Sequence, residues 1–339
     1  MFRTGAAPRV MNSPHHPISL EAIRNVVADD MKAIDELIRR RLQSEVALID
    51  QIAHYIIESG GKRLRPALVA LSGNLFNAPR EHRHELAAVI EFIHTATLLH
   101  DDVVDESSLR RGRKTANAEF GNAASVLVGD FLYSRAFQMM VKVGNQRVMD
   151  VLADATNVIA EGEVLQLLNI HNPETDEESY LRVVRYKTAK LFQAASQTGA
   201  ILGNASQRDE QALAEYGMHL GTAFQLIDDV LDYSGDLKET GKNIGDDLAE
   251  GKPTLPLICA MRQGNAEQRG AVRRAIEAGG RDGMDAVIAA INATGALDYA
   301  RAAAQKEAHA AENAISHLPD SVYRNALLQL CVFAVERRF

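Results

Sequence analysis

Proline placement constrains the fold of this 339-residue chain more than any other feature of its sequence. The nine prolines cluster, and none occurs between Pro79 and Pro173, between Pro173 and Pro253, or between Pro256 and Pro319. A proline inside a helix removes a hydrogen bond and clashes with the preceding turn, so these gaps favour long helices. Alternating β-branched runs are scarce, whereas strong helix formers such as Ala, Leu, Glu, Gln and Arg are plentiful. The sequence therefore predicts an all-α fold.

We expect one helical domain over residues 18–339, preceded by a flexible tail. Residues 1–17 carry three prolines and no hydrophobic periodicity, which is typical of such a tail. The stretches 86–104 and 212–231 are apolar nearly all round, as in helices that lie inside a bundle. The expected helices cover residues 19–43, 45–58, 63–76, 80–106, 123–142, 146–171, 177–203, 208–235, 254–263, 266–278, 281–293, 296–316 and 320–337.

Composition excludes several classes of protein. No apolar run reaches about 18 residues, so a membrane span is not expected, and the first residues lack the apolar core of a secretory signal. Cys259 and Cys331 are too few for a disulfide scaffold or a four-thiolate zinc site. The net charge of −8 has the wrong sign for a broad nucleic-acid footprint. We therefore expect a cytoplasmic protein that does not bind nucleic acid.

Two aspartate triplets point to metal chemistry. Asp101 and Asp105 are four residues apart at the end of the first apolar stretch, so they are neighbours on one helix face, with Asp102 about 100° round the helix. Carboxylates this close repel each other unless a cation lies between them, and magnesium prefers oxygen ligands shared with water and phosphates. A solvated helix end would explain one such motif. The pattern recurs, however, at the end of the second apolar stretch, at Asp228, Asp229 and Asp232.

Basic residues supply a matching set of phosphate ligands. The segment Gly60-Gly61-Lys62-Arg63-Leu64-Arg65-Pro66 places three cations next to a pair of glycines, just ahead of an expected helix. Arg forks and Lys point charges are suited to diphosphate oxygens. Solvated charges at a helix end are the alternative explanation, but the two acidic triplets favour phosphate binding. Further basic or polar residues follow at Arg110, Arg111, Lys187, Thr188, Lys238, Lys242 and Lys252.

The order of these motifs resembles that of a known enzyme family. GGKRLRP, LLHDDVVDES, RRG, KT, FQLIDDVLDYSGD and GKNIGDDLAEGKPTLP follow one another over residues 60–256. In this order they are similar to the trans-type polyprenyl diphosphate synthases, over roughly residues 20–338. The resemblance implies a bundle of long helices around a central cavity, of the isoprenoid synthase type.

The resemblance also implies a reaction and a role for each motif. Members of the family condense isopentenyl diphosphate head to tail onto an allylic diphosphate, here farnesyl diphosphate, with about three magnesium ions. The implied magnesium ligands are Asp101, Asp102, Asp105, Asp228, Asp229 and Asp232, and the implied catalytic residues are Asp101, Asp105, Asp228 and Lys187. Isopentenyl diphosphate would contact Lys62, Arg65, His94 and Arg111. The allylic diphosphate would contact Arg110, Lys187, Thr188, Gln225, Lys242 and Lys252.

Product length is expected to depend on residues farther down the first acidic helix. Short-chain members of the family tend to place a bulky aromatic residue about one turn before the first aspartate, where this chain has Ala96 and Thr97. These small residues indicate a long product, of eight isoprene units by overall resemblance, for quinone side chains. Among Phe137, Met139 and Met140 on the facing helix, we expect Met140 to stop the growing chain, although core packing is the commoner role of such methionines.

Three alternatives remain open at this stage. A terpene cyclase or squalene-type synthase shares the fold and one acidic motif, but does not explain both triplets and GGKRLRP together. A di-metal carboxylate bundle needs Glu-x-x-His motifs on two helices, whereas the two such motifs here, at 81–84 and 91–94, fall on one. The third alternative is a catalytically silent or partner-dependent subunit of a heteromeric synthase. The resemblance also implies a homodimer with at most transient membrane contact.

Overall fold

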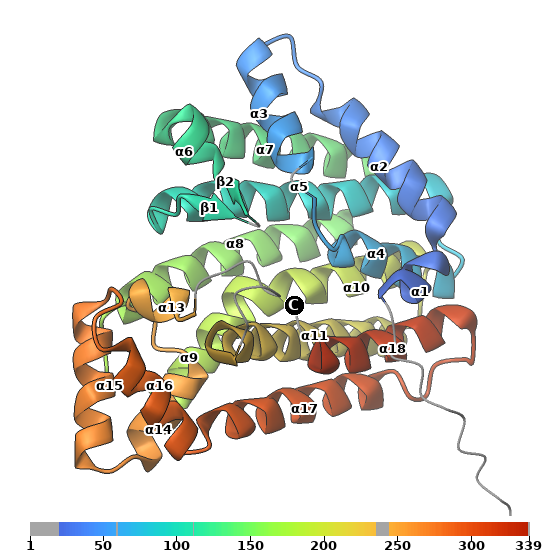
Figure 1. The fold of residues 1–339 in the computed structure, drawn as a ribbon. Coiled ribbons are helices and arrows are strands. Elements are labelled where there is room, and N and C mark those ends of the chain that lie inside the picture. The colour runs from blue at the N-terminus through green and yellow to red at the C-terminus, as the bar shows by residue number, and fades with distance from the viewer. Residues whose placement is uncertain (1–19, 59, 111, 235–243, 338–339) are drawn as a thin grey trace, which may run out of the picture.

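The computed structural model describes residues 20–58, 60–110, 112–234 and 244–337, and its regular structure is almost entirely helical (Figure 1). A short antiparallel hairpin pairs β1 (Leu109–Arg110) with β2 (Arg113–Lys114). The expected all-α fold is confirmed. The helices are α1 (Leu20–Asn25), α2 (Ala28–Leu42), α3 (Ala47–Glu58), α4 (Leu64–Leu75), α5 (Arg80–Val104), α6 (Ala116–Phe120), α7 (Asn122–Val143), α8 (Gln146–Asn169), α9 (Glu177–Val183), the π-helix η1 (Val184–Ala189), α10 (Lys190–Leu202), α11 (Gln207–Ser234), α13 (Asp246–Ala249), α14 (Leu255–Gln263), α15 (Ala266–Ala278), α16 (Met284–Ala293), α17 (Ala296–Ala314) and α18 (Val322–Glu336).

Most expected helices are present, and two of them are divided. The range 19–43 is broken between α1 and α2, and the range 177–203 contains α9, η1 and α10 in direct succession. The short helices α6 and α13 and the hairpin were not expected, because segments of two to five residues carry no hydrophobic periodicity. The boundary expected between a tail and the domain, at residues 17 and 18, lies outside the described residues.

Several helices start where a side chain can cap them. The side chains of Asn145, Asp176 and Ser321 accept hydrogen bonds from backbone N–H groups three residues later, at the starts of α8, α9 and α18. Helix α15 begins with a reciprocal capping box between Asn265 and Gln268. These bonds satisfy N–H groups that have no partner within the first turn of the helix.

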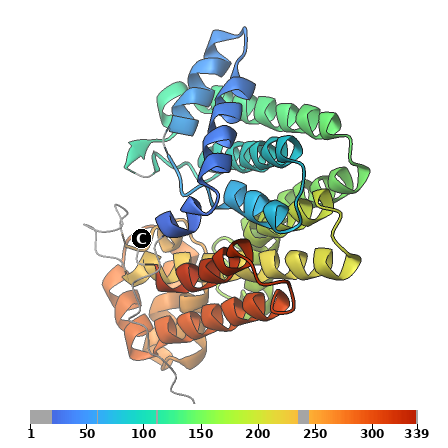
Figure 2. The ribbon, with the colours of Figure 1, turned by 90° about the vertical axis from the view of Figure 1, so that its right-hand side faces the viewer.

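The two apolar helices predicted from the sequence form the centre of the bundle. Helix α5 packs against α4 and α7, while α11 packs against α10 and α17 (Figures 1 and 2). Leu86, Ile90 and Phe92 on α5 are fully buried, as predicted. Val104 is not, because α5 ends beside a cavity and leaves this side chain 63% exposed.

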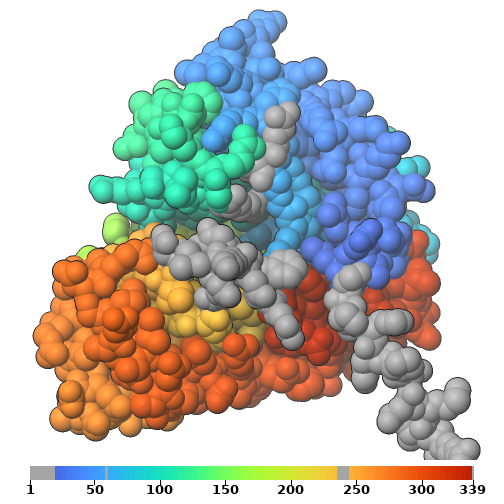
Figure 3. Space-filling view, in the orientation of Figure 1, coloured from blue at the N-terminus to red at the C-terminus, as the bar shows by residue number. Residues whose placement is uncertain are grey.

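A smaller apolar cluster lies at one end of the bundle. Val272, Ile276, Val287 and Ile291 pack together there across α15 and α16, shown in orange in Figure 3. The cluster adjoins the end of α11 through the buried ring of Tyr233. Among the described residues, no helix is both long and apolar enough to cross a membrane.

Candidate active site

One cleft of about 600 Å³ gathers most of the residues that the sequence singled out. It lies between the C-terminal halves of α5 and α11, and the loop before α4, η1 and the segment after α13 also contribute to it. The predicted residues that line it are Lys62, Arg65, His94, Thr97, Asp101, Asp105, Arg110, Lys187, Thr188, Gln225, Asp228 and Lys252. Arg111 and Lys242 lie outside the described residues.

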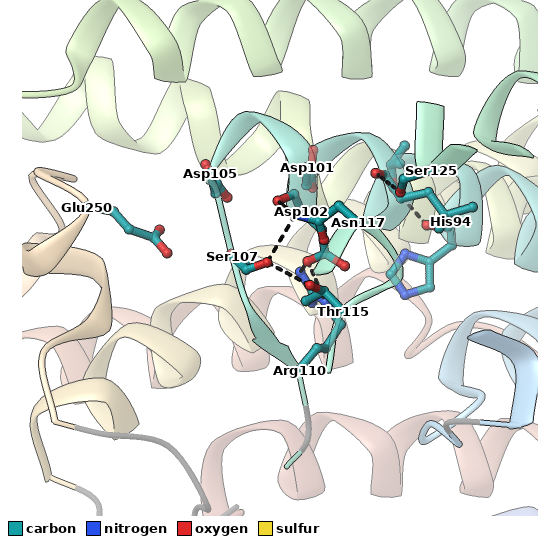
Figure 4. Close-up of polar contacts among 12 residues, drawn as sticks. His94, Asp101, Asp102, Asp105, Ser107, Arg110, Thr115, Asn117, Ser125 and Glu250 are labelled. Atoms are coloured by element: carbon teal, nitrogen blue, oxygen red, sulfur yellow. Dashed lines mark hydrogen bonds and ion pairs between the residues drawn. The ribbon is translucent and has the colours of Figure 1, made fainter. Parts of the chain in front are cut away.

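In the first triplet, two aspartates line the cleft and the third does not. Asp101 lies 3.6 Å from Lys187, and Asp105 lies 2.9 Å from Lys252. The side chain of Asp102 is only 1% exposed, and Arg110 donates to its Oδ1 from Nε at 2.9 Å and from Nη2 at 2.7 Å (Figure 4). Burial raises the pKa of Asp102, and the Arg110 guanidinium partly offsets this rise. Asp102 therefore holds the hairpin against α5, and its predicted role as a magnesium ligand stays a prediction.

The two lysines that face this triplet are each shared with a glutamate. Lys187 Nζ donates to Glu163 at 2.5 Å, and Lys252 Nζ lies 2.6 Å from Glu250. Burial raises the pKa of Glu163 to about 7, with Lys187 opposing the rise and Asp101 adding to it. Burial alone would lower the pKa of Lys252, but the surrounding carboxylates, chiefly Asp105 and Glu250, raise it above its ordinary value. The sequence analysis did not single out Glu163 or Glu250, although Glu250 lies within the GKNIGDDLAEGKPTLP motif.

In the second triplet, only Asp228 lines the cleft. The side chain of Asp228 is 43% exposed and forms an ion pair of 2.7 Å with Arg337, a residue that the sequence analysis missed. Asp229 is buried and accepts hydrogen bonds from Tyr180 and Gln225; burial above all, together with the nearby Asp247, raises its pKa well above the usual range.

Asp232, the last member of this triplet, bonds to the backbone. It accepts from the N–H groups of Asp246 at 3.1 Å and Asp247 at 3.3 Å, at the start of α13. Burial and the charge of Asp247 raise its pKa to about 8. Neither Asp229 nor Asp232 lines the cleft, and their predicted roles as metal ligands stay predictions.

A π-helical turn brings Lys187 and the adjacent Thr188 to the cleft. Such turns are rare in proteins, and those that do occur are often found at functional sites. Thr188 donates to Gln225 Oε1 at 3.1 Å. A glycine at 162 lets α8 approach this turn, since a Cβ there would lie 2.6 Å from the backbone nitrogen of Lys187. Gly221 lets α11 approach the same turn, since a Cβ there would lie 2.6 Å from the Cα of Ala189.

A basic wall faces the aspartates. The guanidinium of Arg65 stacks over Phe192 at 4.4 Å and donates to Nε2 of His94 at 3.2 Å. Lys62 Nζ lies 5.9 Å from the centre of the Phe224 ring. The third cation of the GGKRLRP segment, Arg63, instead forms an ion pair with Glu91 on α5.

A second cavity, of about 570 Å³, continues from the cleft between α5, α7 and α8. It shares Thr97, Asp101, Asp105, Glu163 and Gln166 with the cleft, and most of its remaining lining is apolar or aromatic. Ala96 and Met140, both predicted to affect product length, are buried in the core and do not line it, so their roles stay predictions. Lining side chains beyond the aspartates include Val104, Tyr133, Phe137, Ile159, Ala160, Val164 and Leu167.

The chain was compared with known proteins. It is 51% identical over 323 residues to the octaprenyl diphosphate synthase of Haemophilus influenzae, covering 95% of this chain and 98% of that one. It is 52% identical over 321 residues to the Escherichia coli enzyme of the same name, covering 94% and 99%. The structure matches a polyprenyl synthase from Caulobacter crescentus, solved with calcium and isoprenyl diphosphate, with a TM-score of 0.92 and 43% identity, covering 96% and 100%.

A second solved structure, a decaprenyl diphosphate synthase from Rhodobacter capsulatus, matches with a TM-score of 0.88 and 46% identity, covering 95% of this chain and 100% of that one. A model of the polyprenyl synthetase family matches residues 46–293. The chain therefore belongs to the polyprenyl synthetase family and has the all-helical isoprenoid synthase fold.

Proposed function

We propose that this chain is a magnesium-dependent prenyltransferase that adds isopentenyl diphosphate repeatedly to an allylic diphosphate, with octaprenyl diphosphate as its product. The observation that carries the proposal is the arrangement of the cleft. Asp101, Asp105 and Asp228 face a basic wall that includes Lys62 and Arg65, and an apolar cavity continues from the aspartates. Two charged diphosphates and one growing hydrocarbon chain fit these three surfaces.

The donor set fits magnesium. Asp101, Asp105 and Asp228 offer only carboxylate oxygens, from two helices, next to lysines that could share a diphosphate. Within the described ranges, no three Asp, Glu, His or Cys side chains come close enough to hold an ion by themselves. An ion that takes several of its oxygens from a substrate suits such an open set. When bound, magnesium would stabilise the negative charge that develops on the departing diphosphate.

The protein's own groups have three tasks in this reaction. Lys187, Thr188, Gln225 and Lys252 would hold the allylic diphosphate, whose carbon–oxygen bond breaks to leave an allylic cation. The basic wall would hold isopentenyl diphosphate so that its double bond attacks that cation. A proton then leaves the new chain for the departed diphosphate, and the chain extends into the cavity beside Phe137.

The length of eight isoprene units rests on relatives with 51–52% identity that are named octaprenyl diphosphate synthase, among them those of Haemophilus influenzae and Escherichia coli. The test is an incubation of the purified chain with magnesium, farnesyl diphosphate and labelled isopentenyl diphosphate, followed by sizing of the dephosphorylated product. A single C40 polyprenol is expected. Another length would contradict the proposed product and leave the reaction intact, whereas no incorporation by the folded chain would point to a partner-dependent subunit.

We also propose that two copies of the chain associate through α7 and α8. Both helices expose several apolar side chains. Large exposed apolar patches mark interaction sites, and symmetric dimers are the commonest oligomers. Light scattering at micromolar concentration should give twice the mass of 37.1 kDa, and a monomer would contradict the dimer. The exposed apolar side chains on these helices are Val126, Leu127, Val141 and Leu168, together with Phe137, Val164 and Leu167, which also line the second cavity.

A further inference from the structure

The last residue that the structure describes, Arg337, lines the cleft. It follows α18, which ends between the upper and lower helices in two perpendicular views (Figures 1 and 2). Its guanidinium donates to Asp228 Oδ1 at 2.7 Å from Nη1 and to the carbonyl of Phe224 at 2.6 Å from Nη2. Nε donates to the carbonyl of Ala334 at 3.3 Å, and the group stacks on the Phe224 ring at 3.7 Å.

The two partners of this ion pair differ in their access to solvent. The Arg337 side chain is 3% exposed, whereas the Asp228 side chain is 43% exposed. Arg337 therefore supports the carboxylate from its buried side and engages one of its two oxygens.

The aspartates of the first triplet are held differently. Lys187 and Lys252, which pair with Asp101 and Asp105, end in single flexible ammonium groups. Arg337 is fixed at the same time by two backbone carbonyls and one aromatic face. Its planar guanidinium therefore sets the direction of the carboxylate.

We propose that Arg337 is a positioning residue, which orients Asp228 for the binding of magnesium and a diphosphate and so couples the end of the chain to the second aspartate triplet. The inference rests on the proposed function and adds to it a residue outside the family motifs quoted above. Arg337 acts here through Asp228 and not by contact with isopentenyl diphosphate.

The test compares Arg337→Ala and Arg337→Lys with the matched control Arg324→Ala. Arg324 is on α18, the helix that Arg337 follows, and also donates to two backbone carbonyls, those of Ile315 and Ser316, but it does not line the cleft. Binding of inorganic diphosphate is measured by calorimetry with and without magnesium, and steady-state kinetics give the magnesium concentration for half-maximal rate. KM for isopentenyl diphosphate is measured at saturating magnesium.

Arg337→Ala should weaken magnesium-dependent diphosphate binding and raise the half-maximal magnesium concentration about tenfold, since a charge-assisted bond to Asp228 is lost. Arg337→Lys should restore part of this loss, and Arg324→Ala should change neither quantity. In an Asp228→Asn background, Arg337→Ala should add no further loss.

Two results would overturn the inference. One is a rise in KM for isopentenyl diphosphate with unchanged magnesium dependence, which would mean that Arg337 binds that substrate itself. The other is a lower melting temperature with unchanged diphosphate binding, which would mean a packing role. If Arg337→Ala does not fold, Arg337→Lys alone tests the inference by the same binding and kinetic measurements. Failure of the proposed function would be visible separately, as a wild-type chain that neither binds magnesium diphosphate nor incorporates label.

Discussion

Asp102 directs its Oδ1 at Arg110, which donates to it twice, at 2.9 and 2.7 Å, while its neighbour Asp101 lines the cleft opposite Lys187. Adjacent carboxylates of one motif thus have different partners. One supports the hairpin that follows α5, and the other is available to a ligand.

This difference predicts unequal effects of two similar substitutions. Asp101→Asn should lower kcat/KM at least about 100-fold, since a charge that faces the metal and the diphosphate is lost. Asp102→Asn should cost no more than about tenfold, because both bonds from Arg110 end on one oxygen, which an asparagine keeps. Initial rates at saturating magnesium measure both. Equal losses would show that Asp102 is itself a metal ligand.

A glycine contact is expected to fix the position of Lys252. Gly251 has a φ of +73°, and a Cβ at this position would lie 2.4 Å from the ring of His171. The backbone N–H of His171 also donates to the carbonyl of Gly251 at 2.9 Å. Gly251→Ala should therefore displace Lys252 and weaken magnesium diphosphate binding several-fold, besides lowering stability by about 1–2 kcal/mol.

The matched control for this substitution is Gly280→Ala. Gly280 has a similar φ of +76°, but a Cβ there meets nothing within 4 Å. The Gly280→Ala variant should therefore have a strained backbone and a lower stability, but unchanged magnesium diphosphate binding. Calorimetry on both variants separates the two effects, and an equal loss of binding would rule out the positional explanation.

A buried aspartate far from the cleft should make stability depend on acidity. Asp30 accepts hydrogen bonds from Asn74, Arg83 and His84, where α2, α4 and α5 meet. Burial alone would raise the pKa of Asp30, but these bonds outweigh burial and hold the pKa below its usual range. Its stabilising effect is therefore complete above the unfolded pKa of about 3.9 and is lost as the pH falls through the lower folded value.

Asp30→Asn should lower the free energy of unfolding by about 3 kcal/mol at pH 7, as expected when one member of a buried ionic network is removed. The difference from the wild type should shrink steadily below pH 4. Urea unfolding at several pH values measures this. A difference that stays constant down to pH 2 would mean that the ionised form of Asp30 is not what stabilises the fold.

Product length should respond to Met140 but not to its neighbour. Helix α7 runs antiparallel to α5 (Figure 1), and Ser125 near its start bonds to the carbonyl of Leu99 near the end of α5, so Met140 lies deeper along α7 than Phe137. Met140→Ala should remove bulk beyond the cavity and give longer products. Met139→Ala removes the same volume at an equally buried position and should leave the length unchanged. Chromatographic sizing of the polyprenols distinguishes them, and identical product lengths from the two variants would exclude Met140 as a stop.

The sequence predicted the parts of the site that depend on local spacing. Asp101 and Asp105 share a helix face because they are four residues apart, and both line the cleft. The different environment of Asp102 depends on Arg110 and a hairpin of two-residue strands, which no periodicity reveals. Glu163 and Arg337 reach the cleft through tertiary packing, at sequence separations of 24 and 109 residues from their partners. The π-helical turn was likewise missed, because one extra residue in a turn leaves the hydrophobic pattern almost unchanged.

The pairing of each cleft aspartate with a protein cation has a consequence for turnover. Since Asp101 and Asp105 already have Lys187 and Lys252 as counter-ions, a metal–diphosphate complex that arrives replaces existing ion pairs and does not enter a site of unpaired charges. Arrival and departure of each diphosphate then swap one set of ion pairs for another. An enzyme that releases one diphosphate and binds another at every round of chain growth benefits from this exchange. The electrostatic free energies of the occupied and the empty cleft differ little, so neither state is too stable to leave.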